Sequence, residues 1–257
     1  MYSKYKKNYF SQNGEDGIIE KIISDLKITK KLFVCEFGAW DGVFLSNTFN
    51  LVKKFNAIAL LIEGDSERFN DLIKTSKKNP SIIPVNKYVK SSGHCCLDEI
   101  LKENNFPNNF DVLSIDIDSN DLEIWESLNN YNPKIVVIEI NSGILPGIEQ
   151  KHNLEDNKQG NSFTSTLIVA NKKGYSLIVH TGNLIFLRND LINKIEFNQE
   201  LLNDPNKLFD YDWINVKKKD NNIIIRILKT LIPKFIRKNI SSSLKYNIIR
   251  ILNKINK

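Results

Sequence analysis

Residues 32 to 42 read LFVCEFGAWDG, and this stretch decides the fold that the sequence predicts. Its first half is an apolar run, which breaks into a turn that begins at Gly38 and ends at Gly42. A short apolar run that glycines terminate indicates a buried strand entering a tight turn, and such a turn exposes backbone N–H groups to a ligand. We therefore expect a ligand-binding turn after a first strand, although the pattern by itself also fits an ordinary glycine turn.

A second buried strand is predicted at residues 57 to 62, and an acid, Glu63, follows it directly. In doubly wound α/β folds, an acid at the end of the second strand accepts hydrogen bonds from both ribose hydroxyls of a nucleoside ligand. The two strands together predict a nucleoside-type cofactor at the carboxyl edge of a parallel sheet.

The residues between the two glycines indicate which cofactor this is. A dinucleotide needs the pattern G-x-G-x-x-G, which lets the backbone approach a pyrophosphate. Residues 38 to 42 read GAWDG instead, so bulky Trp40 and anionic Asp41 stand where the phosphates would lie. An acid there repels a pyrophosphate and suits a cationic ligand. S-adenosylmethionine, which carries a sulfonium and an ammonium group, is therefore the predicted cofactor.

Strand and helix patterns alternate along the rest of the chain. Further strands are predicted at 82–85, 110–116 and 134–140, and a terminal hairpin at 175–180 and 184–187. Such alternation indicates a parallel sheet, and the hairpin adds an antiparallel edge. The predicted fold class is α/β, with a long loop at 143–161 on the substrate side.

The charge is divided unevenly along the 257 residues, whose formal net charge is +6. Twelve of the 36 Lys and Arg residues and one of the 30 acids lie between 217 and 257, so residues 1 to 216 hold 24 basic and 29 acidic residues. A mildly acidic body does not describe a nucleic-acid-binding protein. We expect a domain at 1–216 and a basic amphipathic helical tail at 217–257. Such a tail is typical of helices on anionic membranes, and docking on a protein partner or on its own domain are the alternatives.

Cysteine usage and hydropathy bear on the compartment. Three cysteines without a C-x-x-C pair argue against a disulfide framework and against a zinc knuckle. The first residues contain no apolar signal segment, and no run approaches the roughly 18 apolar residues of a membrane span. We expect a cytoplasmic protein, associated with the inner face of the membrane if its tail binds lipid.

Six segments, in this order along the chain, resemble the FkbM family of S-adenosylmethionine-dependent methyltransferases. They are SQNGEDG at 11–17, FVCEFGAWDG at 33–42, LLIEGD at 60–65, LSIDIDSND at 113–121, VVIEIN at 136–141 and GYSLIVHTGNLIFLRND at 174–190. The resemblance implies a Rossmann-like class I methyltransferase fold with a seven-stranded sheet. It also implies methylation of a hydroxyl on a sugar or other small molecule, often in bacterial capsule or lipopolysaccharide biosynthesis.

The strand ends and the resemblance together give the expected donor-binding residues. From the residues alone SQNGED is a helix cap, whereas the resemblance implies that Gln12, Glu15 and Asp16 also contact the donor. Asn86 follows the third strand and is expected beside the adenine ring. The full expected set is Gln12, Glu15, Glu36, Gly38, Ala39, Asp41, Gly42, Asn47, Glu63, Gly64, Asn86 and Asp116.

Methyl transfer to a hydroxyl is an in-line displacement that needs alignment and a group that helps to remove the proton. The expected catalytic residues are Asp118, His180 and His152. A metal would serve the same purpose, because carboxylate and amide oxygens suit Mg²⁺ or Mn²⁺. The expected ligands are Asp116, Glu139 and Asn141, unless Asp116 only lines the donor site and Glu139 is an ordinary strand-end acid.

Two other functions fit parts of the sequence. Asp116-Ile117-Asp118 is a D-x-D, the arrangement with which metal-dependent glycosyltransferases hold a nucleotide sugar. A non-catalytic nucleoside-binding protein would have the same cofactor site but would transfer no methyl group. The expected partner is a small-molecule or glycan-precursor acceptor, with no nucleic acid; the sequence leaves a homo-oligomer open.

Overall fold

The structure is a computed structural model that describes residues 1–117, 120–153, 155–156 and 159–214. The chain divides into two units, Met1–Asp210 and Tyr211–Lys257, and every helix and strand named below belongs to the first. The tail predicted at 217–257 lies outside the described residues.

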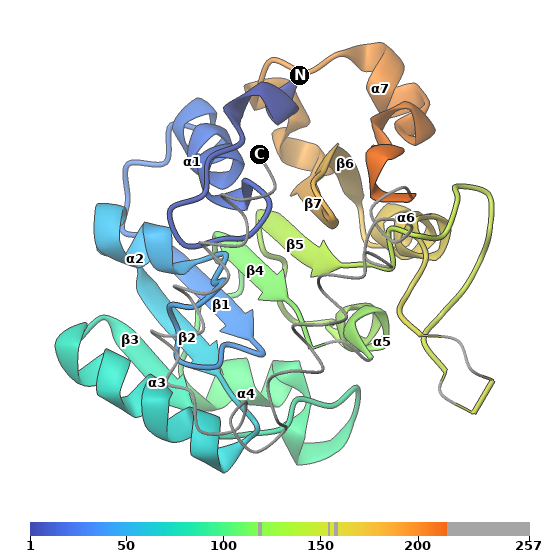
Figure 1. The fold of residues 1–257 in the computed structure, drawn as a ribbon. Coiled ribbons are helices and arrows are strands. Elements are labelled where there is room, and N and C mark those ends of the chain that lie inside the picture. Colours follow the sequence, from blue (N-terminus) through green and yellow to red (C-terminus); the bar gives the residue numbers. More distant parts are fainter. Residues whose placement is uncertain (118–119, 154, 157–158, 215–257) are drawn as a thin grey trace, which may run out of the picture. The chain divides into compact units, whose positions relative to one another are not determined.

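Seven strands form one sheet, in the order β3-β2-β1-β4-β5-β7-β6 (Figure 1). They are β1 (Phe33–Phe37), β2 (Ile58–Ile62), β3 (Ile82–Val85), β4 (Val112–Ile115), β5 (Ile135–Glu139), β6 (Tyr175–His180) and β7 (Asn183–Arg188). Strands β1 to β5 pair in parallel, whereas β7 runs antiparallel to both β5 and β6. The predicted fold class, a mostly parallel sheet closed by an antiparallel hairpin, is confirmed.

Helices precede, connect and follow the strands. The α-helices are α1 (Glu15–Asp25), α2 (Phe49–Phe55), α3 (Ser66–Lys78), α4 (Leu97–Glu103), α5 (Asp121–Ser127), α6 (Phe163–Lys172) and α7 (Gln199–Asn203). Short 3₁₀ helices lie at Tyr2–Tyr5, Gly93–Cys95, Asn189–Lys194 and Pro205–Leu208. α2 begins at Phe49, after Ser46 and Thr48, whose hydroxyls bond a buried carboxylate, Glu36.

Helices cover both faces of the sheet. Successive residues of a strand point to opposite faces. Leu187 of β7 belongs to one apolar cluster with Ile22 of α1. Its neighbour Phe186 contacts Trp125 of α5, with ring centroids 5.3 Å apart. The strands are therefore buried from two sides, and ligands can reach the sheet only at its edges and strand ends.

The carboxyl edge of the sheet collects loops from both halves of the domain. β1 pairs in parallel with β2 and β4, so these three strands end side by side. Glu139, at the end of β5, pairs with Asn183 at the start of β7. The β6–β7 turn therefore lies at the same edge, which is where open α/β sheets bind ligands.

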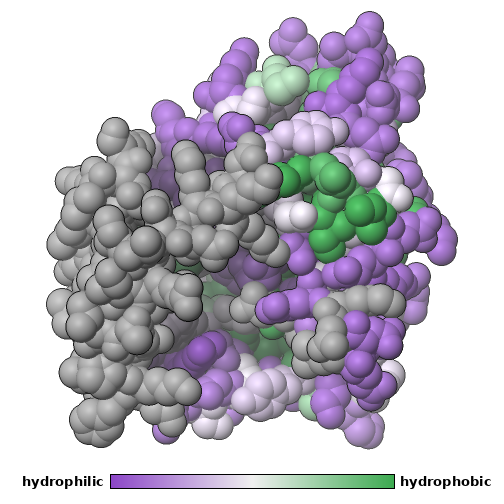
Figure 2. All heavy atoms as spheres, turned by 45° about the vertical axis from the view of Figure 1, so that its right-hand side comes forward, coloured by the Kyte–Doolittle hydropathy of each residue, from purple (hydrophilic) through white to green (hydrophobic). Residues whose placement is uncertain are grey.

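The surface near the long β5–α6 loop carries exposed apolar side chains. In Figure 2 the right-hand side of Figure 1 is turned forward, and this view shows a compact apolar area among hydrophilic residues. The loop lies on this side, and its Leu145 and Ile148 are 46% and 50% exposed. Among the helices that the structure describes, none is both long and apolar enough to cross a bilayer.

Candidate functional site

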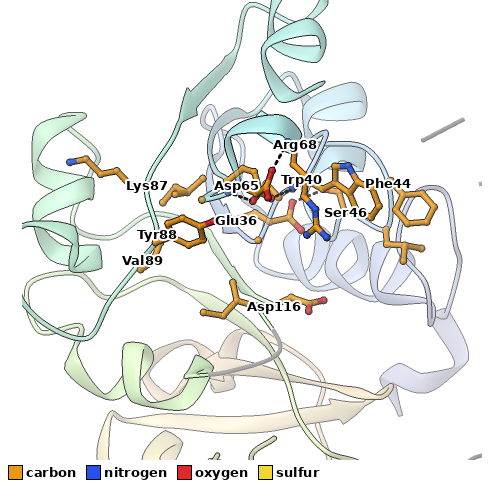
Figure 3. A pocket seen from close by; sticks show the side chains of 17 residues that line it. Glu36, Trp40, Phe44, Ser46, Asp65, Arg68, Lys87, Tyr88, Val89 and Asp116 are labelled. Atoms are coloured by element: carbon orange, nitrogen blue, oxygen red, sulfur yellow. Dashed lines mark hydrogen bonds between the residues drawn. The ribbon is translucent and has the colours of Figure 1, made fainter. Parts of the chain in front are cut away.

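A cavity of about 620 Å³ opens at the carboxyl ends of β1, β2 and β4 (Figure 3). Its walls come from the β1–α2 loop, the end of β2, the first turn of α3, the segment after β3, and the two residues that follow β4. Six of the expected donor-binding residues line it: Glu36, Gly38, Ala39, Glu63, Gly64 and Asp116. The sequence therefore located the cavity correctly, while the roles of these residues stay predictions.

The β1–α2 loop turns sharply against the end of β4. Gly38 has a φ of +76°, and a Cβ atom there would lie 1.9 Å from the carbonyl oxygen of Asp116. Only glycine tolerates both the left-handed conformation and this approach. Trp40 and Leu45 also have positive φ, at +47° and +56°. Such conformations cost free energy and cluster at ligand-binding sites.

The carboxylate of Glu63 holds this loop in place. Its Oε2 accepts a hydrogen bond from the backbone N–H of Trp40, and its Oε1 accepts one from the backbone N–H of Asp65, both at 2.8 Å. Glu63 is only 5% exposed but lies in the cavity wall. A carboxylate oxygen accepts more than one hydrogen bond, so both oxygens keep capacity for a hydroxyl group of a ligand.

Gly64, the next residue, gives an aromatic ring access to the cavity. A Cβ atom on Gly64 would lie 2.3 Å from Cδ1 of Tyr88, because the Tyr88 ring lies directly over this glycine. The ring is part of the cavity wall, and Tyr88 is 66% exposed. A flat apolar surface beside a carboxylate suits a ligand with an aromatic part and hydroxyl groups.

Glu36 forms the buried floor of the same region. Its carboxylate accepts hydrogen bonds from the Ser46 hydroxyl at 2.5 Å, the Thr48 hydroxyl at 2.6 Å and the Asn47 backbone N–H at 2.9 Å. Burial raises the pKa of Glu36, and the three donors oppose that shift. The amide of Asn47 donates to the Ser114 hydroxyl at 3.1 Å and so fastens the loop to β4.

The other expected donor-binding residues do not line the cavity, and their contacts with the donor stay predictions. Asp41 was expected to face a cationic ligand, but its Oδ1 accepts the backbone N–H groups of Val43 and Phe44. Asn86 donates from its amide to the carbonyl oxygen of Glu63 at 2.7 Å. The remaining residues outside the cavity wall are Gln12, Glu15, Gly42 and Asn47.

The SQNGED segment braces the N-terminal loop and the terminal hairpin. Asp16 accepts three backbone N–H groups at its Oδ2, those of Tyr9, Phe10 and Ser11. In return, the Ser11 hydroxyl accepts the N–H of Asp16 at 3.1 Å, much as a cap would. The N-cap of α1 is Gly14, which has no side-chain cap bond, so the predicted cap is wrong, although the segment does brace the loop before the helix.

Glu15 ties the start of α1 to the β6–β7 turn. Its Oε1 accepts a hydrogen bond from the Thr181 hydroxyl at 2.7 Å, and its Oε2 accepts the Asn13 N–H at 2.8 Å. Glu15 is 1% exposed, and burial raises its pKa. The carboxylate therefore faces the protein interior and is not part of the cavity wall.

His180 does not fit the predicted role of general base. The Ser142 hydroxyl donates to the Gly182 carbonyl oxygen, so it accepts from Nε2 of His180, 2.8 Å away. Nδ1 accepts the backbone N–H of Asp210 at 3.0 Å. Both ring nitrogens are thus engaged, the residue is 2% exposed, and burial lowers its pKa to about 4. We assign His180 a structural role.

The two other catalytic candidates lie in or near loops. His152 accepts the backbone N–H of Gly160 at its Nδ1, at 3.1 Å, and so braces the β5–α6 loop. It is not part of the cavity wall. Asp118 lies outside the described residues. Both assignments remain predictions.

The structure does not support the predicted Mg²⁺ or Mn²⁺ site. Asn141 accepts the N–H of Gly143 and donates to the carbonyl oxygen of Gln159, so its amide is used within the loop. Glu139 is the last residue of β5 and pairs with Asn183 of β7, whereas Asp116 lines the cavity. Within the described ranges, no three His, Cys, Asp or Glu side chains are grouped so that they could hold a metal ion.

Sequence reasoning missed several residues of the cavity wall, among them Tyr88, Lys87 and Arg68. Arg68 reaches from the first turn of α3 into the cavity, and its guanidinium lies 4.7 Å from the centre of the Trp40 ring (Figure 3). Trp40 itself was noticed only as too bulky for a phosphate site. No local pattern distinguishes Arg68 from the other surface residues of an amphipathic helix.

Comparison with protein-family models and with curated proteins finds no match. Solved methyltransferase structures are similar at low identity. The N-terminal domain of EvdMO1 with SAH bound is 10% identical over 70% of this chain and 81% of that chain, with a TM-score of 0.44. Precorrin-6y C5,15-methyltransferase from Geobacter metallireducens is 12% identical over 70% of this chain and 90% of that chain, with a TM-score of 0.43. TrmK from M. capricolum with S-adenosyl-homocysteine is 16% identical over 92% and 96%, with a TM-score of 0.41.

Proposed function

We propose that this protein is an S-adenosylmethionine-dependent methyltransferase. One observation carries the proposal: the buried carboxylate of Glu63 stands in the wall of a cavity at the carboxyl edge and holds the β1–α2 loop through Trp40. An acid after the second strand, beside a glycine turn after the first, is the arrangement that receives a ribose in doubly wound sheets.

The charge of the cavity wall favours a cationic donor. Four carboxylates contribute to it, from Glu36, Glu63, Asp65 and Asp116, against two cationic side chains, Arg68 and Lys87. A sulfonium is attracted by such an excess of acids, and a pyrophosphate is repelled. The same excess argues against a nucleotide sugar and therefore against the glycosyltransferase alternative.

For the acceptor we propose a hydroxyl of a sugar or another small molecule, in surface-polysaccharide biosynthesis. This finer proposal is supported by the resemblance of the six sequence segments to the FkbM family. Transfer to a hydroxyl requires alignment with the methyl carbon and removal of a proton. With His180 engaged in the interior, Asp118 and His152 remain as the proposed bases.

Isothermal titration calorimetry with S-adenosylhomocysteine tests the donor proposal. We expect binding to the wild-type chain and at least about tenfold weaker binding to Glu63→Gln, since hydrogen bonds to a charged group contribute about 1.5–3 kcal/mol. Glu67→Gln is the matched control, because it removes one exposed acid from the same turn outside the cavity wall. Binding of a uridine diphosphate sugar without adenosylhomocysteine would support the glycosyltransferase instead.

Transfer itself needs a second measurement. Incubation with S-adenosylmethionine and a panel of glycan precursors, with and without EDTA, should yield adenosylhomocysteine and a methylated hydroxyl. A chain that binds the donor but releases no adenosylhomocysteine with any acceptor would be a nucleoside-binding protein.

For the basic segment at 217–257 we propose contact with an anionic membrane surface, supported by its amphipathic sequence pattern. Deleting these residues should abolish co-sedimentation with liposomes that contain anionic lipid, and neutral liposomes are the control. Equal sedimentation of the full and shortened chains would contradict this proposal.

A further inference from the structure

Arg68 is a cationic side chain in a cavity whose wall is mainly acidic. The residue belongs to the first turn of α3, and Figure 3 shows its side chain extending toward the middle of the cavity. The other cation in the wall, Lys87, forms an ion pair with Glu103 of α4. Within the part of the chain that the structure describes, no ion pair and no hydrogen bond of the Arg68 guanidinium is found.

The guanidinium of Arg68 makes a cation–π contact with Trp40. Its Cζ lies over the Trp40 ring, 4.7 Å from the ring centre. A cation over an aromatic ring gains electrostatic attraction to the face of the ring. This contact uses no N–H hydrogen bond, and the N–H groups of a guanidinium are the donors that bind a carboxylate or phosphate in a bidentate manner.

The platform under Arg68 is itself fixed. The backbone N–H of Trp40 is bonded to Glu63, and the Trp40 ring contacts Phe44 edge-on, with centroids 5.4 Å apart. Oδ1 of the neighbouring acid, Asp65, accepts the backbone N–H groups of Glu67 and Arg68, and among the described residues its carboxylate forms no ion pair with the guanidinium, although the two charges attract each other. The arrangement therefore presents a cation in a defined position beside the predicted ribose site.

We propose that Arg68 binds an oxyanion, a carboxylate or a phosphate, on a molecule that occupies this cavity. The inference rests on the proposed function, because the molecule is then the donor or the acceptor of the methyl group. Two sources share this chemistry. One is the carboxylate in the amino-acid part of the donor, and the other is an anionic group on the acceptor.

Calorimetry with two nucleosides and inorganic phosphate distinguishes the sources. S-adenosylhomocysteine carries the amino-acid carboxylate, whereas 5′-methylthioadenosine has the same nucleoside without it. If Arg68 holds the donor carboxylate, Arg68→Gln weakens adenosylhomocysteine binding about tenfold or more and leaves methylthioadenosine binding unchanged. Arg68→Lys keeps the charge but loses the bidentate geometry. Its affinity for adenosylhomocysteine should therefore lie between those of the wild-type chain and Arg68→Gln.

If Arg68 holds an acceptor oxyanion, both nucleosides bind Arg68→Gln as they bind the wild-type chain. The wild-type chain should then broaden the ³¹P NMR signal of inorganic phosphate, and Arg68→Gln should not. Lys74→Gln removes a charge from the same helix outside the cavity wall and should change none of these readouts. Equal weakening of both nucleosides would assign Arg68 only to the shape of the loop and overturn the inference. So would unchanged binding of all three probes.

The two proposals can fail separately. If the wild-type chain binds neither nucleoside, the methyltransferase proposal fails, and loss of phosphate binding in Arg68→Gln still supports an anion site. If the wild-type chain binds none of the three probes, both proposals fail.

Discussion

The backbone N–H of Trp40 donates to the carboxylate of Glu63 across 2.8 Å, and this bond joins the turn after β1 to the end of β2. The same carboxylate accepts the N–H of Asp65, at the start of α3. One side chain therefore shapes the loop, positions the helix and lines the cavity. Glu63 therefore braces the loop in addition to its proposed role in binding the donor.

Replacing Glu63 should loosen the fold as well as the site. Glu63→Ala removes the acceptor of two backbone N–H groups, and we expect a loss of about 3 kcal/mol in the free energy of unfolding. Glu63→Gln keeps one carbonyl oxygen and should lose less. Urea unfolding measures both values. Equal stability of Glu63→Ala and the wild-type chain would contradict the bracing role.

Gly38 should be sensitive to a single methyl group. Gly38→Ala must place its Cβ against the Asp116 carbonyl oxygen, in addition to the strain of a φ of +76°. Gly93 is a matched control, because it has the same φ and nothing lies within 4 Å of the position that its Cβ atom would take. We expect Gly93→Ala to lose about 1–2 kcal/mol in unfolding free energy and Gly38→Ala clearly more. Similar losses for the two variants would show that the backbone at the end of β4 moves aside at little cost in free energy.

Asp16 should control the order of the N-terminal loop. Asp16→Ala removes the acceptor of three backbone N–H groups, so hydrogen exchange at residues 9–11 should accelerate strongly and stability should fall by about 3 kcal/mol. Asp71→Ala, on exposed α3 surface, should change neither. Unchanged exchange in Asp16→Ala would mean that other contacts hold the loop.

His180 should make stability fall in mild acid. Its pKa is lowered from 6.5 to about 4 by burial, with Asp210 raising it and Lys6 lowering it. The unfolded chain therefore takes up a proton first as pH falls. The contribution of the neutral ring is complete above about pH 6.5 and is lost progressively toward pH 4, by about 3 kcal/mol.

His180→Phe separates this titration from those of other groups. The variant loses the bonds to Ser142 and Asp210 at every pH, so its stability should be lower throughout but less dependent on pH between 6.5 and 4. Denaturation at several pH values measures the difference. Parallel pH profiles for the two chains would show that His180 does not titrate in this way.

The fold was predictable because the apolar strands are short and glycines or polar residues end them. All of the expected strands formed, and Glu63 follows β2 as its position in the sequence predicts. Parallel strands that are buried on both faces show near-continuous apolar runs, which are visible without a structure. The carboxyl edge and its cavity follow from that arrangement.

The orientation of individual side chains was less predictable. Asp41 lies on the expected loop, and its carboxylate accepts hydrogen bonds from the local N–H groups of Val43 and Phe44. His180 lies at the expected strand end but between Ser142 and Asp210, a residue 30 positions later. Such long-range partners leave no local trace in the sequence, and Arg68 on Trp40 was missed for the same reason.

The bond between Glu15 and Thr181 spans 166 positions along the chain. A ribosome makes the acid early and its hydroxyl partner much later, so through most of translation this carboxylate stays hydrated and the first helix has no hairpin to dock on. Closure of the domain must therefore await the last two strands, and any nascent chain halted before them would present an unfinished edge to chaperones and proteases.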